Sequence, residues 1–424
     1  MKSIVVFGAG KSATCLIDYL SKICTENGWR LSIGDADAQT LQRKLAHMPS
    51  IDPVQVNVEN AAERTALIQK ADLVISLLPP ALHILIARDC VSNAKNLLTA
   101  SYVDDDIKKL GNQIREKGLF FLCEMGLDPG IDHMSAMEII HRIHEKGGKI
   151  KIFRSHTGGL VAPESDDNPW HYKISWNPAN VVRAGSAGAV FLESGKVKKI
   201  AYPDIFEKTG LVEIKPLGHF AWYPNRDSLS YIPVYGLESA QSFIRTTLRH
   251  PVFCTGWKEI VRAGLTSEGP PIPPTVKTYA DWSKPLLAFT NDGNRHLYNQ
   301  LGLFENEILP QGQITSAKIL QTRLEQKWKM QDEDKDMIVM LHEFEFEIEN
   351  QTKYLRSSLV VKGENAVRTA MAKTVGLPLG IAAKLVLENK MTLTGLHIPI
   401  IPEIYIPVLK ELSGEGIRFH EEIN

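Results

Sequence analysis

Residues 3–13 read SIVVFGAGKSA, a short run of apolar and β-branched residues followed by a glycine-rich segment. The run predicts a strand, and the segment after it opens a helix. Within the segment, Gly8, Gly10 and Ala13 form a GxGxxA pattern. Between a strand and a helix, this pattern lets backbone N–H groups and the helix dipole meet a pyrophosphate. The stretch therefore predicts a dinucleotide-binding unit rather than an ordinary tight turn.

The same alternation continues over the first 130 residues. Short apolar or β-branched runs are separated by amphipathic helical stretches, and these runs are SIVVF, RLSIG, VQVNV, DLVISLL, NLLTAS and LFFLCEM. Such alternation predicts an α/β fold with a doubly wound parallel sheet of six strands. Ligands bind this kind of sheet outside the carboxyl ends of its strands, so the residues after each strand are the candidate site residues.

The end of the second predicted strand bears on the choice of dinucleotide. This strand ends in Gly34 and Asp35, at about the distance from the glycines at which an acid contacts the adenine ribose. A carboxylate accepts hydrogen bonds from the ribose diol of NAD but repels the 2′-phosphate of NADP. Asp37 is nearby, and the first arginine after the strand is Arg43. We therefore expect NAD, with NADP disfavoured, unless Asp35 only caps the helix that follows it.

The ends of the later strands suggest how the rest of the dinucleotide is held. Residues 77–80, LLPP, are apolar and stiff, which suits the flat face of a nicotinamide or adenine ring. The fifth strand ends in Ala100, Ser101 and Tyr102, and the last two offer hydroxyls to the same edge. The expected cofactor contacts are Gly8, Gly10, Ser12, Asp35, Leu78, Ala100, Ser101 and Leu127.

The sixth strand leads into GLDPGIDH, residues 126–133, which brings a carboxylate to the same edge. The Pro-Gly turn redirects the chain into a helix that begins near Asp132. Asp128 is the first candidate for contact with a substrate amine and for the catalytic group, with an ordinary turn aspartate as the alternative. For Asp132, next to His133, capping of the helix is the favoured role.

Composition limits the class of protein and of partner. A chain of 424 residues is too long for one hydrophobic core and suggests two or three domains. The net charge of −1 favours neither nucleic acid nor an anionic membrane as a partner, and points to a small molecule. Five scattered cysteines form no CxxC pair, as expected of free thiols in a reducing compartment. We therefore expect a cytoplasmic protein.

Several segments together resemble one enzyme family. These segments are ISLLPPALH, TASY, GLDPGIDHMSAMEII, GGLVAPESDDNPWHYKISW, YPNRDS, RTTLRH and, near the C-terminus, VGLPLGIAAKLVLENKM. They resemble the L-glutamate-forming saccharopine dehydrogenases, or saccharopine reductases, and the matching half of bifunctional aminoadipic semialdehyde synthase. The resemblance implies a homodimer and a fold of three parts. Those parts are a Rossmann domain (1–128 and about 364–424), an α/β domain for substrate binding and dimerisation (129–264 and about 336–363) and a helical insertion (265–335).

The resemblance also implies a reaction, in which saccharopine is reversibly oxidised with NAD(P) to L-glutamate and 2-aminoadipate 6-semialdehyde. An arginine fork suits the carboxylates of such a substrate. By resemblance the substrate contacts are Ser101, Tyr102, Asp128, Arg226, Thr247, Leu248 and Arg249. The chain departs from relatives that carry Tyr-Cys before the glycine pair and a proline after the Gly-Gly-Leu segment, because it has His156-Thr157 and Val161 at these positions.

Some assignments stay open at this stage. The proton carrier could be Asp128, His156, Lys173 or bound water. The alternative functions are a related amine oxidoreductase acting on lysine or carboxynorspermidine, and a non-catalytic dinucleotide sensor. His141 and His144 lie three residues apart on a predicted helix, but without an evident third ligand a solvated helix face is favoured over a metal site.

The segment from about 265 to 363 predicts packing rather than chemistry. Ala317, Leu320, Leu324 and Trp328 fall on one helical face and are expected in a core. In the alternating run HEFEFEIEN the phenylalanines face one side and the glutamates the other, which predicts a half-exposed hairpin with its glutamates in solvent.

Overall fold

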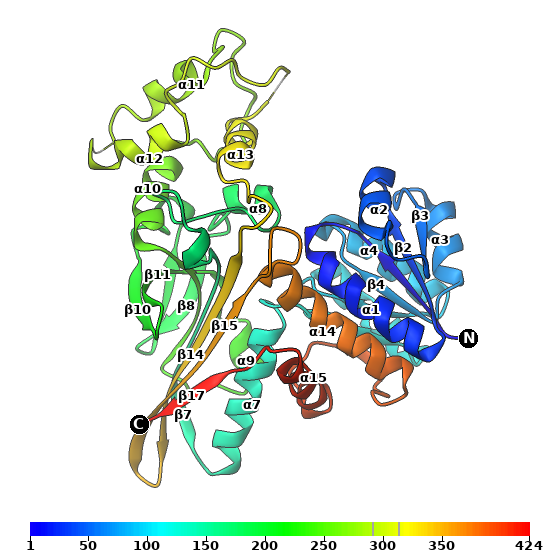
Figure 1. Cartoon of the computed structure of the whole chain (residues 1–424). Coiled ribbons are helices and arrows are strands. Elements are labelled where there is room, and N and C mark those ends of the chain that lie inside the picture. Colours follow the sequence, from blue (N-terminus) through cyan, green and yellow to red (C-terminus); the bar gives the residue numbers. More distant parts are fainter. Residues whose placement is uncertain (291, 313) are drawn as a thin grey trace. The chain divides into compact units, whose positions relative to one another are not determined.

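The computed structural model describes residues 1–424 except 291 and 313. The chain divides into two compact units, residues 1–142 with 367–418 and residues 143–366 with 419–424 (Figure 1). The division falls inside one helix, after Arg142, and the predicted helical insertion belongs to the second unit. The roles expected for the second unit, substrate binding and dimerisation, stay predictions.

The first unit contains the predicted doubly wound sheet, with all strands parallel and in the order β16–β6–β5–β4–β1–β2–β3. The strands are β1 (Ser3–Phe7), β2 (Arg30–Asp35), β3 (Ile51–Gln55), β4 (Leu73–Ser76), β5 (Asn96–Thr99), β6 (Phe120–Leu122) and β16 (Gly395–His397). The predicted fold class is confirmed. The third strand lies slightly earlier than the run VQVNV, and a seventh strand, β16, comes from the C-terminal part of the chain.

Nine α-helices of the described chain lie wholly or partly in this unit, and the last two come from far along the chain. They are α1 (Thr14–Asn27), α2 (Ala38–Leu45), α3 (Ala61–Gln69), α4 (His83–Ser92), α5 (Asp105–Lys109), α6 (Gly111–Glu116), α7 (Ile131–Glu145), α14 (Ala370–Leu387) and α15 (Pro402–Gly414). Helix α14 packs closely on α1 because Gly376 and Gly380 have no side chain, and a Cβ at Gly376 would lie 2.8 Å from the Leu16 nitrogen. Among the described residues α14 is the single helix long and apolar enough to cross a membrane, yet 78% of it is buried in the protein.

The second unit is built on a mixed sheet whose main path is β10–β11–β13–β7–β14–β15–β17, with β8, β9 and β12 beside it (Figure 1). These strands are β7 (Lys149–Val161), β8 (Ala189–Glu193), β9 (Lys196–Ile200), β10 (Gly210–Ile214), β11 (Gly218–Pro224), β12 (Arg226–Asp227), β13 (Ser242–Arg249), β14 (Asp336–Ile348), β15 (Gln351–Lys362) and β17 (His420–Ile423). Strands β14 and β15 form the predicted hairpin, and Phe344 and Phe346 are buried as expected. The prediction that its glutamates lie in solvent is wrong for Glu343, which is half-buried and bonded to His156.

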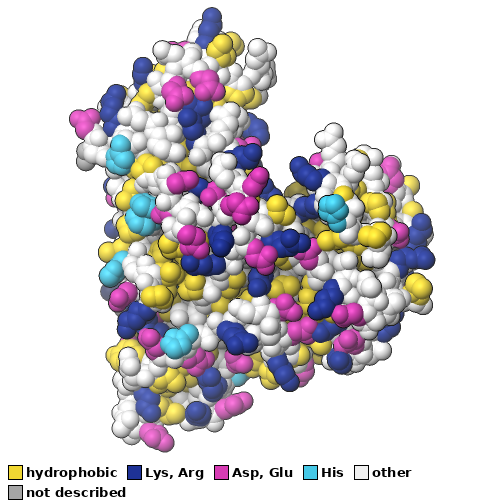
Figure 2. All heavy atoms as spheres, in the orientation of Figure 1, with side chains coloured by type: hydrophobic (Ala, Val, Ile, Leu, Met, Phe, Trp, Pro, Cys, Tyr) yellow, Lys and Arg dark blue, Asp and Glu magenta, His cyan; other side chains and the backbone are white. Residues whose placement is uncertain are grey.

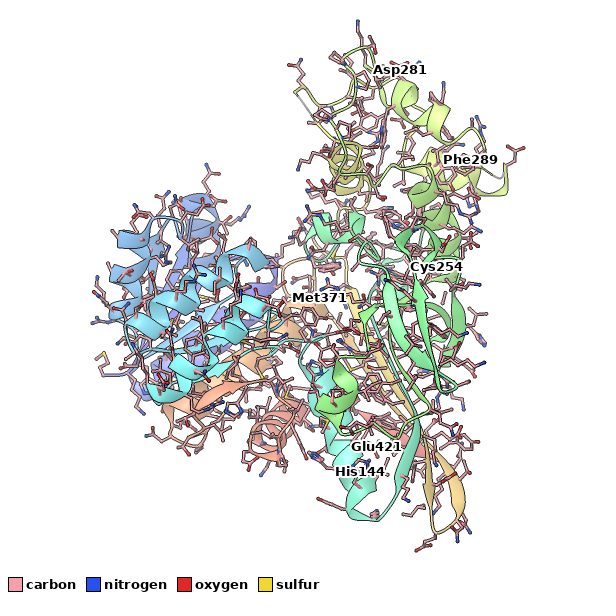
Figure 3. The ribbon with its side chains drawn as sticks, turned by 180° about the vertical axis from the view of Figure 1, so that it is seen from behind. His144, Cys254, Asp281, Phe289, Met371 and Glu421 are labelled. Atoms are coloured by element: carbon pink, nitrogen blue, oxygen red, sulfur yellow. The ribbon has the colours of Figure 1, made fainter. Side chains whose placement is uncertain are left out.

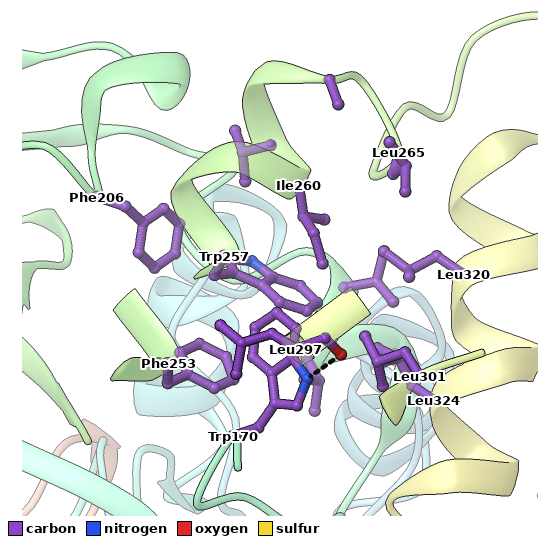
Figure 4. Packing of buried hydrophobic residues seen from close by; sticks show 14 of the residues in the cluster. Trp170, Phe206, Phe253, Trp257, Ile260, Leu265, Leu297, Leu301, Leu320 and Leu324 are labelled. Carbon is purple, nitrogen blue, oxygen red and sulfur yellow. Dashed lines mark hydrogen bonds between the residues drawn. The ribbon is translucent and has the colours of Figure 1, made fainter. Parts of the chain in front are cut away.

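An aromatic core joins five helices of the second unit, α8 (Pro178–Val182), α10 (Pro251–Arg262), α11 (Tyr279–Leu286), α12 (Arg295–Gln300) and α13 (Ser316–Lys327). Helix α9 (Tyr231–Tyr235) lies outside this core, and its Tyr235 contacts Phe153 and Phe243. Trp170, Trp257 and Trp328 are fully buried in it, and the indole nitrogen of Trp170 donates a hydrogen bond to the Leu297 carbonyl at 2.9 Å (Figure 4). The predicted stripe on α13 lies in the same core, so its packing role is confirmed.

The distribution of surface charges and the state of the cysteines agree with what the composition predicted. Figure 2 shows acidic and basic side chains interspersed over the viewed face, as expected of a nearly neutral chain. The cysteines are free, and Cys254 on α10 is buried (Figure 3). Burial raises the pKa of the Cys254 thiol to about 12, so this group is not an activated nucleophile.

Candidate active site

The glycine-rich loop after β1 has the backbone geometry that a phosphate-binding turn needs. Gly8 has a φ of +103°, and a Cβ there would lie 2.7 Å from the Leu77 carbonyl oxygen, so only glycine fits. At Gly10 a Cβ would meet no atom, which leaves the space in front of the loop open. Gly10 precedes the helical turn Lys11–Ala13 that runs into α1, and no side chain caps this end. The loop therefore fits a pyrophosphate held by backbone N–H groups.

The carboxylate of Asp35 supports this loop. One oxygen, Oδ2, accepts a hydrogen bond from the Ala9 N–H at 2.7 Å, and the other, Oδ1, accepts one from the Asp37 N–H at 2.9 Å. Asp35 does not cap α2, because Asp37 holds that position and accepts from the Gln39 N–H. Both oxygens of Asp35 thus have backbone partners.

Lys44 is a cation beside the loop that the sequence reasoning missed. It lies in the last turn of α2, and its ammonium donates to the Gly10 carbonyl and, at 2.9 Å, to the Thr14 hydroxyl. Burial lowers the pKa of Lys44 to about 8. No local pattern marks this residue, because the contact depends on how α2 packs against α1.

The other expected cofactor contacts gather at the same edge of the first unit. The backbone of Leu77, next to Leu78, bonds to Phe7 at the end of β1, and the Met125 N–H bonds to the Thr99 carbonyl. A Cβ at Gly126 would lie 3.0 Å from that of Ala100, so the loops after β5 and β6 touch. The fold thus brings Leu78, Ala100, Ser101 and Leu127 to the carboxyl edge of the sheet, together with Gly8, Gly10 and Ser12.

Asp128 is half-buried in this edge, next to Tyr102. The Tyr102 hydroxyl lies 3.4 Å from Asp128 Oδ1, a long hydrogen bond. A hydrogen bond stabilises the turn around Asp128, because the Gly130 N–H donates to Asp132 Oδ1 at 2.6 Å. Asp132 therefore ties the turn to the start of α7.

A buried acid and imidazole, also missed from the sequence, lie behind the same turn. His133 Nε2 is 2.8 Å from Glu124 Oε2, and both side chains are almost fully buried. The second oxygen, Glu124 Oε1, accepts from the Val103 N–H at 3.1 Å. Through these bonds the pair connects the loop that carries Tyr102 to α7. The sequence CEMGLDPGIDH could have indicated this pair, because an acid and a histidine in a buried segment need polar partners.

In the second unit, Arg249 is a buried cation with no ion pair among the residues that the structure describes. Its side chain is almost fully buried, and its guanidinium lies 5.2 Å from the ring centre of Tyr172 and 5.5 Å from that of Phe253. Nη1 donates to the Leu248 carbonyl at 2.8 Å, and Nε has no hydrogen-bond partner. Burying a charge without an anion is costly, so this arrangement favours a bound carboxylate.

The remaining substrate residues predicted for this unit lie in different places. Thr247 pairs with Tyr223 on β11 and Thr157 on β7, and the buried Thr157 hydroxyl has no partner. Leu248 points to the other face of the sheet, into an apolar core. Arg226 is exposed on β12, which pairs with β8 rather than with β13.

The other candidate proton carriers are engaged in the structure. His156 Nδ1 lies 2.7 Å from the Thr246 hydroxyl, and Nε2 lies 3.2 Å from Glu343 Oε2. Lys173 makes ion pairs of 2.7 Å with both Asp167 and Asp334. His156 and Lys173 are thus tied into internal networks.

No metal centre is found within the described part of the chain. No group of three or more His, Cys, Asp or Glu side chains could hold an ion there. His141 bonds to the Tyr405 hydroxyl at 2.8 Å instead.

A doubly wound sheet with a phosphate-binding turn at its edge defines a dinucleotide-binding protein. Two family models match the chain, the saccharopine dehydrogenase NADP binding domain over residues 4–122 and the saccharopine dehydrogenase C-terminal domain over residues 126–417. The chain therefore belongs to the saccharopine dehydrogenase family, as the sequence resemblance predicted.

Known relatives agree with this assignment. The mitochondrial alpha-aminoadipic semialdehyde synthase of Mus musculus is 33% identical over 99% of this chain and 48% of its own length, so the chain spans about half of that protein. The saccharopine dehydrogenase [NADP(+), L-glutamate-forming] of Pyricularia oryzae is 30% identical over 100% of this chain and 99% of its own. The apo saccharopine dehydrogenase (L-Glu forming) structure from Saccharomyces cerevisiae superposes with a TM-score of 0.89 at 28% identity, covering both chains fully.

These comparisons correct the expected cofactor. The prediction of NAD with NADP disfavoured is wrong, because the matching domain is an NADP binding domain and the fungal relatives are named for NADP(+). The structure supplies a physical reason. Asp35, read from the sequence as an unengaged acceptor for the ribose, already holds two backbone N–H groups, and the cation Lys44 lies beside the loop.

Proposed function

We propose that this protein catalyses the reversible NADP-dependent oxidation of saccharopine to L-glutamate and 2-aminoadipate 6-semialdehyde. The family supports the reaction class, and the full-length fungal relatives carry this activity in their names. The observation that carries the proposal is Arg249, a buried guanidinium with no ion pair among the described side chains, as the binding of a substrate carboxylate requires.

The first unit would hold the dinucleotide. The N–H groups of the loop around Gly8 and Gly10 would bind the pyrophosphate, with Ser12 and Lys44 beside them, and Asp35 keeps this loop in shape. Leu78, Ala100 and Leu127 give an apolar edge that suits a flat ring. When bound, NADP supplies the hydride acceptor, and NADPH the hydride donor in reverse.

The second unit would bind substrate carboxylates through Arg249 and Thr247. An arginine among aromatic rings gains more from an anion than one in water, because the surrounding dielectric is low. The free hydroxyl of Thr157, on the strand paired with Thr247, adds a donor to the same face. Arg226 is exposed, and we propose for it the weaker role of attracting the substrate.

Asp128 is the proposed group for the proton of the secondary amine. Oxidation removes a hydride from the carbon next to this amine and leaves an imine, which water then cleaves to the two products. A carboxylate that accepts the amine proton favours the first step, and Tyr102 orients that carboxylate through its long hydrogen bond.

We also propose a cytoplasmic location and a homodimer. Five free cysteines, four of them buried, suit a reducing compartment. Measurement of the molar mass in solution by light scattering tests the dimer.

The deciding experiment follows NADPH formation with saccharopine, lysine and carboxynorspermidine as separate substrates. We expect turnover with saccharopine alone. Turnover with either other amine, or NADP binding without turnover on all three, would refute the proposed substrate.

A further inference from the structure

Strand β13 changes its neighbour halfway along its length. Near its start, Phe243 pairs with Leu192 of β8, whereas residues 246–249 pair with β11. Strand β11 ends at Pro224, and the next N–H, of Asn225, bonds to the Arg245 carbonyl at 2.9 Å. The sheet therefore opens between β8 and β11, and a cavity of about 210 Å³ lies there.

This cavity is not the proposed substrate site. Its lining includes a row of residues paired across three strands, in which Ile244 of β13 lies opposite Arg154 of β7, and Arg154 lies opposite Glu343 of β14. Side chains alternate along a strand, so Ile244 lies on the opposite face of β13 from Thr247 and Arg249. The two sites thus lie on opposite faces of one sheet.

The cavity presents charges of both signs. Arg154 is half-buried, and its guanidinium makes no hydrogen bond or ion pair with another described side chain, although the charge of Glu343 acts on it. The carboxylate of Glu343 is held by His156 Nε2 at 3.2 Å and by Arg356 Nε at 3.5 Å. Burial acts to raise the pKa of Glu343, but the hydrogen bond and charge of His156, with Arg356 and Arg154, lower it overall, so Glu343 is anionic at neutral pH. Glu193 adds an exposed carboxylate at the rim.

The rest of the wall is apolar. Trp222, Phe191 and Ile244 line the cavity, and Leu211 stands at its edge with 66% of its surface exposed. A pocket for a drug-sized ligand has a volume of about 300–1,000 Å³. This smaller cavity, with one cation, two carboxylates and an apolar wall, suits a small zwitterion.

We propose that this cavity is a second ligand site, which binds a free α-amino acid with an apolar side chain. Arg154 takes the carboxylate, Glu343 and Glu193 take the ammonium group, and the side chain packs on Trp222 and Ile244. The site is for binding and not for catalysis, because His156 and Thr246 behind Glu343 are fully buried and reach no ligand.

The test is isothermal titration of the whole protein with L-leucine, compared with 4-methylpentanoate and 3-methylbutan-1-amine, which each lack one charged group. We expect leucine to bind and both analogues to bind more weakly by about tenfold. Arg154→Gln should weaken leucine binding by about tenfold or more while cofactor binding and saccharopine turnover are unchanged. The matched control is Arg183→Gln, which removes an exposed arginine of the same unit that pairs with Glu268.

Two further outcomes would overturn the proposal. Leucine binding that survives Arg154→Gln but is lost in Arg249→Lys would place the ligand in the proposed substrate site. A fall in molar mass for Arg154→Gln, with no heat from leucine in the wild type, would make this face an interface between copies. These experiments measure leucine binding and molar mass, so their results do not depend on whether saccharopine is the substrate.

Discussion

The two sheets of this protein obtain their neighbouring strands in different ways. In the first unit, β1 to β6 come from one continuous stretch, and the proposed cofactor residues follow directly after the strands. In the second unit, β7 lies between β13 and β14, so His156 pairs with Thr246 on one side and with Leu341 on the other. A site at a parallel edge can therefore be read from position in the sequence, whereas a site on the mixed sheet depends on register between distant segments.

The two proposed sites also differ in the groups that would contact the ligand. In the proposed cofactor site, the edge of the first unit would bind its ligand mainly through backbone N–H groups, in a loop that Asp35 and the glycines shape. The proposed substrate site of the second unit would depend on a few buried side chains, above all Arg249. Substitutions in the second unit should thus have the larger effects on catalysis and the smaller ones on cofactor binding.

Arg249→Met should have the largest effect. We expect kcat/KM for saccharopine to fall by about 100-fold or more, because a charge-assisted contact worth about 3 kcal/mol is lost. The melting temperature should stay the same or rise, since the variant no longer buries an uncompensated charge. Arg183→Met, at an exposed ion pair of the same unit, is the control. An unchanged kcat/KM would remove Arg249 from the site.

His83 should make the first unit sensitive to acid. Burial lowers the pKa of His83 to about 4 from its ordinary 6.5, and Nδ1 lies 2.8 Å from the Ser76 hydroxyl. Between these pH values only the unfolded chain takes up the proton, so the free energy of unfolding decreases as the pH falls, by about 3 kcal/mol in all. Denaturant midpoints between pH 7 and pH 4 measure this. The prediction would be contradicted if the free energy of unfolding changed with pH equally in His83→Gln and in the exposed control His47→Gln.

Asp128→Asn should keep the turn but lower turnover about tenfold, because an amide cannot accept the amine proton. Tyr102→Phe should have a smaller effect, since its hydrogen bond to Asp128 is long at 3.4 Å. Steady-state rates with saccharopine and NADP measure both. Wild-type rates in Asp128→Asn would return this residue to the role of an ordinary turn aspartate.

Lys44→Gln should have the smallest effect. The pKa of Lys44 is about 8, so its positive charge, and its attraction for the dinucleotide phosphates, is lost as the pH rises through that value. We expect NADP binding by the wild type to weaken about threefold from pH 7 to pH 9, and binding by the variant to be weaker at pH 7 and nearly constant. Fluorescence titration of NADP at several pH values measures this. Parallel curves for the two proteins would show that Lys44 does not contact the cofactor.

Much of the first unit was predictable from the sequence, and the wrong or missed predictions concern single residues. The alternation of strands and helices, the glycine loop and the position of Asp128 at the edge follow from short-range patterns. The cofactor prediction failed at Asp35 because the sequence cannot show whether a carboxylate is free, and here the Ala9 and Asp37 N–H groups take both oxygens. Lys44 and Glu124 were missed because their partners lie on other elements.

The sequence by itself determined the strand–turn–helix start, the alternation that makes a doubly wound sheet and the family resemblance, because each rests on the periodicity and turn chemistry of neighbouring residues. Only the tertiary structure decided which polar groups are buried and what they meet. Arg249 and Arg226 look alike in sequence, yet one is enclosed by aromatic rings and the other is exposed. Burial depends on strand pairing between distant segments, and a charge gains its energetic weight only from the dielectric and the partners that this pairing provides.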